Sequence, residues 1–107
     1  MNVYLISFTS KTYKVKRTDI QNYFDTRTEV INWFGIMPEA ILVTTNNSDA
    51  EIANMLIEKF GNDITFLITK TEPNLTNGFI NKDVWEFINN PKPANSTPNL
   101  LGIGLPK

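Results

Sequence analysis

The sequence predicts an α+β domain of the ferredoxin-like type, βαββαβ, in which two helices cover one face of a four-stranded antiparallel sheet. A C-terminal helix and an extended tail follow. Two observations predict this fold. Short β-branched and aromatic runs alternate with amphipathic stretches in the order β-α-β-β-α-β. The chain has 107 residues, 41% hydrophobic and 20% charged, which suits one globular domain.

The first strand is expected over residues 2–8, "NVYLISF", and its nearly continuous apolar run favours a central position. The polar, basic stretch 9–17 is expected to be a loop. Thr18 and Gln21 have the capping-box spacing, so we expect Thr18 to be the N-cap of the first helix. The residues that share one face of this helix are Ile20, Tyr23 and Phe24.

The second strand is expected over residues 29–34, with Gly35 as its end. Pro38 cannot occupy a central strand, so "GIMPE" is expected to be a connection and residues 40–45 a separate third strand. Ser48 and Glu51 form a second capping box, and Gly61 stands where a helix often ends. The apolar stripe of this second helix consists of Ile52, Met55, Leu56 and Phe60.

The last strand is expected over residues 63–69, and a third helix over "NKDVWEFINN" points Val84, Trp85 and Ile88 inward. Pro91 ends this helix. We therefore expect a ferredoxin-like domain over residues 1–90 and a Pro-rich extended tail over residues 91–107. The apolar end of the tail, "NLLGIGLP", can add a strand to a sheet edge of a partner or of its own domain, or can remain disordered.

The composition excludes several classes of function. The chain contains neither histidine nor cysteine, which removes disulfides, thiolate metal sites, cysteine nucleophiles and the usual base near neutral pH. We expect no catalytic residue, no metal site and no cofactor. No apolar run reaches 18 residues and no signal-peptide pattern is present, so a cytoplasmic protein without a membrane segment is expected.

Four stretches carry a resemblance to a known group. They are "MNVYLISF", "WF...PEAILVTTNNSDAEIANMLIEKF", "DITFLITKT" and "GFINKDVWEFINN". They resemble the small bacterial ferredoxin-like proteins called SinR-like. These are similar in turn to the small dimeric CRISPR adaptation protein, a nuclease in some systems and a scaffold for DNA integration in others.

The resemblance implies that a metal-binding aspartate would stand near the end of the first strand. This chain has Phe8, Thr9 and Ser10 there, and a hydroxyl cannot replace a carboxylate as an anionic magnesium ligand. We therefore expect a protein that is not an enzyme. A metal-dependent nuclease of the adaptation type remains an alternative, with other carboxylates such as Asp19, Asp25 or Asp63.

Four of the ten basic residues fall within seven positions after the first strand. The candidates for nucleic-acid contact are Lys11, Tyr13, Lys14, Lys16 and Arg17. The cations can reach phosphates and the tyrosine can stack on a base. The alternative is an ordinary solvated loop, since the net charge of the chain is −1. The helix-start acids Asp49, Glu51, Asp83 and Glu86 are interpreted as capping and dipole partners rather than catalysts.

Trp33 and Phe34 are adjacent on a strand and therefore point to opposite faces of the sheet. One of them lies away from the helix-covered core, on a face that this fold leaves open. We expect a homodimer through that face, with Trp33 and Phe34 as its candidate residues.

Together these observations favour a non-enzymatic binding or scaffold protein, associated with nucleic acid or with a protein partner in a defence or mobile-element context. Besides the nuclease, a second alternative stays open. It is a protein-interaction module that acts through the open sheet face and the C-terminal tail.

Overall fold

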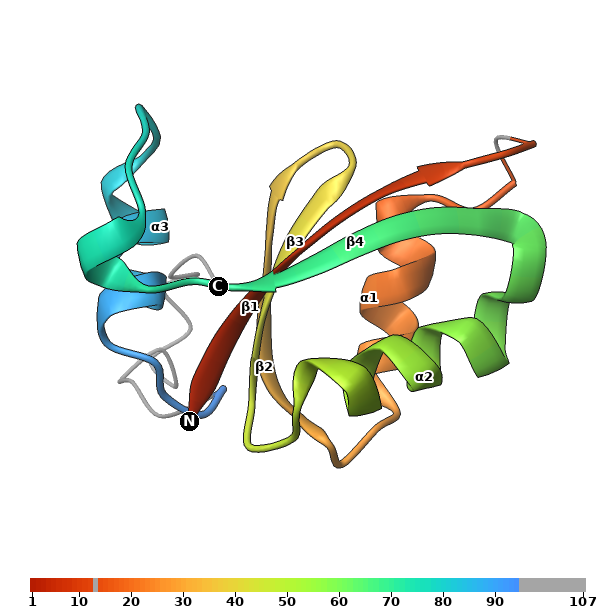
Figure 1. The fold of residues 1–107 in the computed structure, drawn as a ribbon, viewed down its shortest axis with the longest axis horizontal. Helices are drawn as coiled ribbons and strands as arrows, with labels where there is room; N and C mark the ends of the chain where they lie inside the picture. Colours follow the sequence, from red (N-terminus) through yellow and green to blue (C-terminus); the bar gives the residue numbers. More distant parts are fainter. Residues whose placement is uncertain (13, 95–107) are drawn as a thin grey trace, which may run out of the picture.

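The computed structural model describes residues 1–12 and 14–94, and it confirms the ferredoxin-like fold (Figure 1). The strands are β1 (Asn2–Ser10), β2 (Val30–Met37), β3 (Ala40–Thr45) and β4 (Ile64–Lys70), and the helices are α1 (Arg17–Asp25), α2 (Asp49–Phe60) and α3 (Lys82–Asn89). The short 3-10 turns are η1 (Gly61–Asp63) and η2 (Pro73–Leu75). All strand pairs are antiparallel in the order β2-β3-β1-β4, which confirms a central position for β1.

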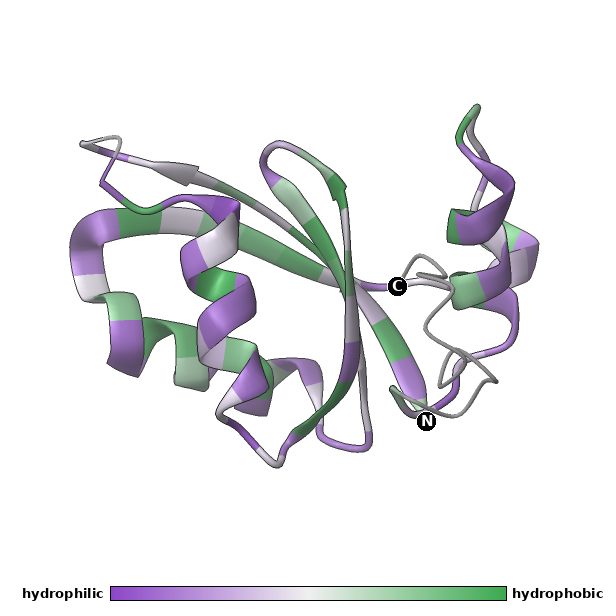
Figure 2. Cartoon of the chain, turned by 180° about the vertical axis from the view of Figure 1, so that it is seen from behind, coloured by the Kyte–Doolittle hydropathy of each residue, from purple (hydrophilic) through white to green (hydrophobic). Residues whose placement is uncertain are grey.

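The first face of the sheet carries the main core, under α1 and α2. Alternation along β1 points Tyr4, Ile6 and Phe8 to this face, and all three are buried. They pack with the buried stripes of α1 and α2, which include Ile20, Phe24, Ile52, Met55 and Leu56. The apolar faces expected for both helices are therefore confirmed. Figure 2 shows the hydrophobic residues concentrated along the strands and on these helices.

The second face is not open, because α3 covers half of it. Val3 and Leu42 form a second core there with Val84 and Ile88 of α3, and the half-buried Trp85 packs against its edge. The expectation of an open second face is wrong for this half of the sheet. The reason is that α3 is itself amphipathic. Packing of its apolar side against the apolar second face removes both surfaces from water, which is favourable.

The boundaries of α2 are confirmed. The hydroxyl of Ser48 accepts a hydrogen bond from the Glu51 amide at 3.2 Å, and the Ser48 amide donates to the Glu51 carboxylate at 3.1 Å. Gly61 ends the helix with φ of 55°, a conformation that favours glycine.

The start predicted for α1 is wrong. The helix begins at Arg17, with Lys16 at the N-cap, rather than after Thr18. The Asp19 carboxylate accepts a hydrogen bond from the Lys16 amide at 2.8 Å. Asp19, the third residue of the helix, thus accepts the hydrogen bond of the N-cap amide, although Lys16 at the N-cap has no acceptor side chain.

The end predicted for β2 is also wrong, because the strand continues through Gly35 to Met37. A Cβ atom at Gly35 would collide with Gln21 Oε1 and would lie 2.6 Å from Arg17 Nε. The glycine therefore allows two side chains of α1 to lie against the strand. Pro38 lies in the turn between β2 and β3, as expected. The observed ranges of β4 and α3 differ from the predicted ranges by one residue at each end.

The first residues of the predicted tail are described as far as Ala94. The Ala94 amide donates to the carbonyl of Ile31 at 3.4 Å, and the Asn32 side chain donates to the carbonyl of Lys92 at 3.3 Å. The rest of the tail, residues 95–107, lies outside the described residues. In the part of the chain that the structure describes, we find no helix with the length and apolar character that crossing a membrane requires.

Candidate functional site

The loop between β1 and α1 is fixed at both ends. Ser10 is 8% exposed, and its hydroxyl accepts a hydrogen bond from the Val15 amide at 3.2 Å. The Lys11 amide donates to the Asp63 carbonyl at 3.0 Å, which continues the pairing of β1 with β4. The cap between Lys16 and Asp19 closes the other end. Ser10 therefore has a structural role at the end of the strand.

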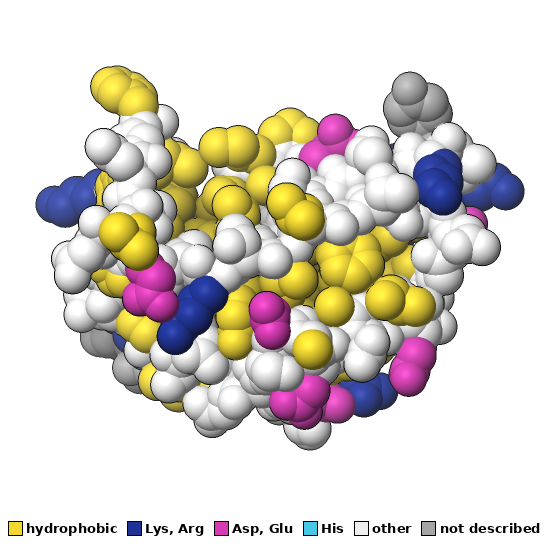
Figure 3. All heavy atoms as spheres, viewed as in Figure 1, with side chains coloured by type: hydrophobic (Ala, Val, Ile, Leu, Met, Phe, Trp, Pro, Cys, Tyr) yellow, Lys and Arg dark blue, Asp and Glu magenta, His cyan; other side chains and the backbone are white. Residues whose placement is uncertain are grey.

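Three lysines of this loop point into solvent. Lys11, Lys14 and Lys16 are all exposed, and none forms an ion pair with a described residue. Figure 3 shows Lys and Arg side chains gathered at the upper right of the molecule, at the end of β1. Tyr13, the expected stacking residue, lies outside the described residues. The backbone hydrogen bonds thus present three ammonium groups on one anchored loop.

Arg17 is placed differently from the three lysines. Its Nη1 donates a hydrogen bond to the Met37 carbonyl at 2.6 Å, and the side chain lies against Gly35. Arg17 Nε and Gln21 Oε1 are buried there without a hydrogen-bond partner. Arg17 therefore ties α1 to the end of β2, and this contact engages its guanidinium.

The structure does not bring the alternative nuclease carboxylates together. Asp19 caps the start of α1, Asp63 lies in the turn before β4, and the Asp25 carboxylate accepts a hydrogen bond from Trp33 Nε1 at 2.6 Å. Among residues 1–12 and 14–94, no group of three His, Cys, Asp or Glu side chains has an arrangement that could hold a metal ion.

The four acids that the sequence analysis assigned to helix starts differ in their positions and contacts. Glu51 belongs to the cap of α2, and Asp49 lies in the first turn of that helix. Asp83 occupies the first turn of α3, and Glu86 accepts hydrogen bonds from Asn90 Nδ2 at 3.2 Å. The positions of Asp49, Glu51 and Asp83 agree with the capping interpretation of the sequence. Glu86 does not, because it lies in the second half of α3 and contacts the C-cap residue Asn90.

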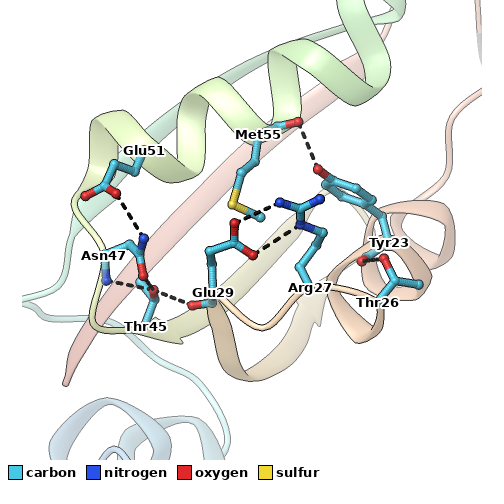
Figure 4. A network of polar contacts seen from close by, with 8 residues as sticks. All are labelled: Tyr23, Thr26, Arg27, Glu29, Thr45, Asn47, Glu51 and Met55. Atoms are coloured by element: carbon cyan, nitrogen blue, oxygen red, sulfur yellow. Dashed lines mark hydrogen bonds and ion pairs between the residues drawn. The ribbon is translucent and has the colours of Figure 1, made fainter.

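A polar network joins the end of α1 to the sheet and to α2 (Figure 4). Arg27 Nη2 lies 2.8 Å from Glu29, and the carbonyl of Glu29 accepts a hydrogen bond from the Thr45 hydroxyl at 2.6 Å. Asn47 donates its amide to Thr45 at 2.9 Å and its side chain to Glu51 at 3.0 Å. The network links the connection between α1 and β2 to the end of β3 and to the first turn of α2.

The charges in this network are stabilised in their ionised forms. The hydrogen bond from Arg27 holds the pKa of Glu29 below its ordinary value. The hydrogen bond from the Ser48 amide, followed by that from Asn47, lowers the pKa of Glu51. Both carboxylates therefore act here as acceptors that hold the structure together.

The two candidate dimer residues lie on opposite faces, as expected. Trp33 packs against the core under α1 and α2. Phe34 lies on the second face, where its ring is 5.7 Å from that of Phe87 in α3. Neither residue is fully exposed. The homodimer stays a prediction, and any contact through the second face would have to use the half that α3 leaves uncovered.

That uncovered half contains an exposed apolar residue, Leu67, that the sequence analysis missed. The strand register places Leu67 opposite Ser7, and Ser7 opposite Ala40, all on the second face. Leu67 is 73% exposed. The sequence contained a signal for it. Thr65, Leu67 and Thr69 lie on the face of β4 that points away from the main core, and Leu67 is the apolar residue among them.

Comparison of the chain with protein-family models, with curated proteins and with solved structures found no match.

Proposed function

We propose that this chain is a non-enzymatic binding protein, a scaffold that contacts the phosphates of nucleic acid through the loop between β1 and α1. One observation carries the proposal. Lys11, Lys14 and Lys16 are exposed, have no ion-pair partner among the described residues, and belong to a loop whose two ends are hydrogen-bonded. An anchored loop loses less conformational entropy when it binds than a free one does.

The electrostatics suit a local contact. The whole chain carries a net charge of −1, so attraction to nucleic acid must come from the loop and not from the molecule as a whole. Phosphate contacts of this kind give affinity without sequence specificity. The resemblance to SinR-like proteins supports the proposal and suggests a defence or mobile-element context.

The test compares two double variants with the same change in charge. Lys11→Glu with Lys14→Glu reverses two loop charges, and Lys82→Glu with Lys92→Glu reverses two exposed charges elsewhere. Binding of short labelled single- and double-stranded DNA and RNA is followed by fluorescence anisotropy at low salt. We expect the loop variant to lose at least about tenfold in affinity, and the control variant to lose much less.

Equal losses in the two variants would contradict a contact through the loop. No binding by the unchanged chain at low salt would contradict nucleic-acid binding altogether. Magnesium is included and the probes are examined after incubation, because cleavage that a loop variant retains would favour the nuclease alternative.

A second candidate function is a protein-interaction module that uses the second face of the sheet. It is favoured by the exposed apolar side chains beyond α3, of which Leu67 at 73% and Met37 at 51% lie nearest to the uncovered half. Exposed aliphatic residues at the end of a β-sheet face are typical of a docking surface.

A further inference from the structure

The two edge strands of the sheet differ in how they are protected. On β2, the carbonyl of Ile31 accepts a hydrogen bond from the Ala94 amide, and the pairing with β3 shifts register near both ends of the strand. Irregular pairing and a chain segment along the edge both hinder the addition of another strand. β4 pairs with β1 in one uniform register and contains no proline. β4 is therefore the edge of the sheet at which another strand can pair.

The backbone groups in the middle of β4 point away from the sheet. Just after β4, the Thr71 amide donates a hydrogen bond to the Val3 carbonyl at 2.8 Å. Bonded and non-bonded pairs alternate in an antiparallel ladder, so every second residue before Thr71 also bonds to β1. The residues between them, Phe66 and Ile68, direct their amides and carbonyls outward, and no hydrogen bond joins these groups to another described residue.

Apolar side chains of β4 border these outward groups on both faces of the sheet. Leu67 is 73% exposed on the second face, and Phe66 and Ile68 are half-buried on the first. Figure 3, in the view of Figure 1, shows hydrophobic side chains along β4 and towards α2. An incoming strand would therefore meet both backbone hydrogen-bonding groups and apolar surface here.

The helix beside this edge adds a further apolar group. α1 lies against β2, and α2 lies against β4. The Met55 carbonyl of α2 accepts a hydrogen bond from Tyr23 of α1 at 3.3 Å, and the Lys59 ammonium lies 5.8 Å from the centre of the same ring. Ile57 stands midway between Met55 and Lys59 in the sequence, so it points to the opposite side of α2, away from α1. It is 53% exposed on the side of the open edge.

The sequence of β4 suits pairing with a second copy of itself. In an antiparallel pair centred on Leu67, Phe66 lies opposite Ile68 of the second copy, and Ile68 lies opposite Phe66 of the second copy. Both are hydrogen-bonded pairs, so the outward amides and carbonyls of these residues are satisfied. The two Leu67 side chains become direct neighbours on the second face, where each shields the other from water.

The charges at the ends of β4 are compatible with this pairing. Lys70 is the charged residue of the strand, and Asp63 comes directly before its start. The antiparallel alignment keeps the two Lys70 residues about 20 Å apart, six residues at about 3.4 Å each. It brings each Lys70, which lies 3.4 Å from Glu72 of its own chain, to the level of Asp63 of the second copy. Like charges on the strands therefore stay apart, as a stable cross-strand arrangement requires.

We propose that the chain forms a two-fold symmetric dimer in which β4 pairs antiparallel with β4 of a second copy, centred on Leu67. The two sheets become one continuous sheet, and Ile57 faces α2 of the second copy. The assembly ends at two chains, because the β2 edges are protected. This dimer uses neither Trp33 nor Phe34, and it does not depend on nucleic-acid contact by the loop.

The absence of cysteine from the sequence permits a direct test by disulfide formation. Leu67→Cys places the two thiols in a non-hydrogen-bonded pair, in which a Cα separation of about 4.5 Å suits a disulfide. Thr69→Cys is the control for register, because its two copies would lie about 14 Å apart along the strands. Leu75→Cys is the control for random collision, since Leu75 is 86% exposed outside the strand.

Each variant is oxidised in the full chain, and covalent dimer is measured by non-reducing electrophoresis. Thermal unfolding of the reduced variants verifies the fold. We expect Leu67→Cys to form the covalent dimer at least about tenfold faster than both controls, because pairing raises the effective concentration of its thiols. Equal rates for the three positions, or a faster reaction at Thr69→Cys, would overturn the proposed pairing.

Sedimentation equilibrium of the unchanged chain measures the dimer without a covalent link. We expect a mass that rises with concentration towards twice that of one chain. Leu67→Lys places two like charges side by side and is expected to weaken the dimer at least about tenfold, whereas the same change in Leu75→Lys should leave it intact. A chain that remains monomeric at about 1 mM, or a dimer that responds equally to both variants, would overturn the proposal.

Discussion

Arg17 Nη1 donates a hydrogen bond to the carbonyl oxygen of Met37 across 2.6 Å, and this contact joins the first turn of α1 to the end of β2. It separates Arg17 from the three lysines beside it in the sequence. Their side chains are exposed without ion pairs to described residues, whereas the arginine already has a structural partner. Stability and binding are therefore expected to depend on different members of the same basic cluster.

Replacement of Arg17 by Ala is expected to lower the free energy of unfolding by about 1 to 2 kcal/mol, because a hydrogen bond from a charged group is lost. Lys14→Ala is the matched control and is expected to change it by less than about 0.5 kcal/mol. Urea unfolding of both variants measures the difference. Equal effects would show that Arg17 is no more structural than its neighbour.

Gly35→Ala is expected to destabilise the fold by about 1 to 3 kcal/mol, because its methyl group would collide with the side chains that α1 places against the strand. Gly78→Ala is the control, since a Cβ there meets no atom within 4 Å. The cost of Gly35→Ala is expected to fall when Gln21→Ala removes the nearest atom. A cost of Gly35→Ala that is the same with and without Gln21→Ala would assign the effect to the contact with Arg17 or to the backbone instead.

Ser48→Ala is expected to cost about 1 kcal/mol, the usual loss when an N-cap hydroxyl is removed. The Ser48 hydroxyl accepts a hydrogen bond from the Glu51 amide at 3.2 Å. Thr18→Ala is the informative comparison, because Thr18 was the cap predicted for α1 and the structure places it inside that helix. Chemical denaturation should therefore show a large effect at Ser48 and a small one at Thr18, and the reverse order would contradict these helix starts.

Glu51 is expected to contribute a pH-dependent part of the stability. Its pKa is lowered in the folded protein from an ordinary value of 4.5. Its stabilising contribution is therefore present above that value and is lost as the pH falls through the lower pKa of the folded state. Thermal unfolding of the unchanged chain and of Glu51→Gln should differ at neutral pH and converge in acid. A difference that does not change with pH would contradict this role.

Local patterns in the sequence were sufficient for most of the fold. The apolar run that predicted a central β1 and the capping box at Ser48 and Glu51 both depend on residues close together in the chain, and the central strand and the cap were predicted correctly. The continuation of β2 through Gly35 was not predicted, because glycine alone indicates a break, whereas here it pairs with Ile41 of β3. The space that the glycine leaves is filled by Gln21 and Arg17 of α1, a contact that no local pattern contains.

In the candidate site, too, the features set by local sequence were predicted and those set by contacts between distant residues were not. The basic loop was visible as a cluster in the sequence, but the engagement of Arg17 by the Met37 carbonyl depends on a contact between residues twenty positions apart. The covered half of the second face was missed because the position of α3 is set by tertiary packing. The exposure of Leu67 could be inferred from the alternation of β4, but its cross-strand neighbours Ser7 and Ala40 could be identified only from the strand register.

The salt dependence of binding to single-stranded nucleic acid tests the central claim most directly. If Lys11, Lys14 and Lys16 each contact one phosphate, the logarithm of the association constant should fall with the logarithm of salt concentration with a slope of about −2. Lys11→Glu with Lys14→Glu should bring that slope close to zero, while Lys82→Glu with Lys92→Glu should leave it unchanged. An unaltered slope in the loop variant, or no binding by the unchanged chain at low salt, would contradict a nucleic-acid interface on this loop.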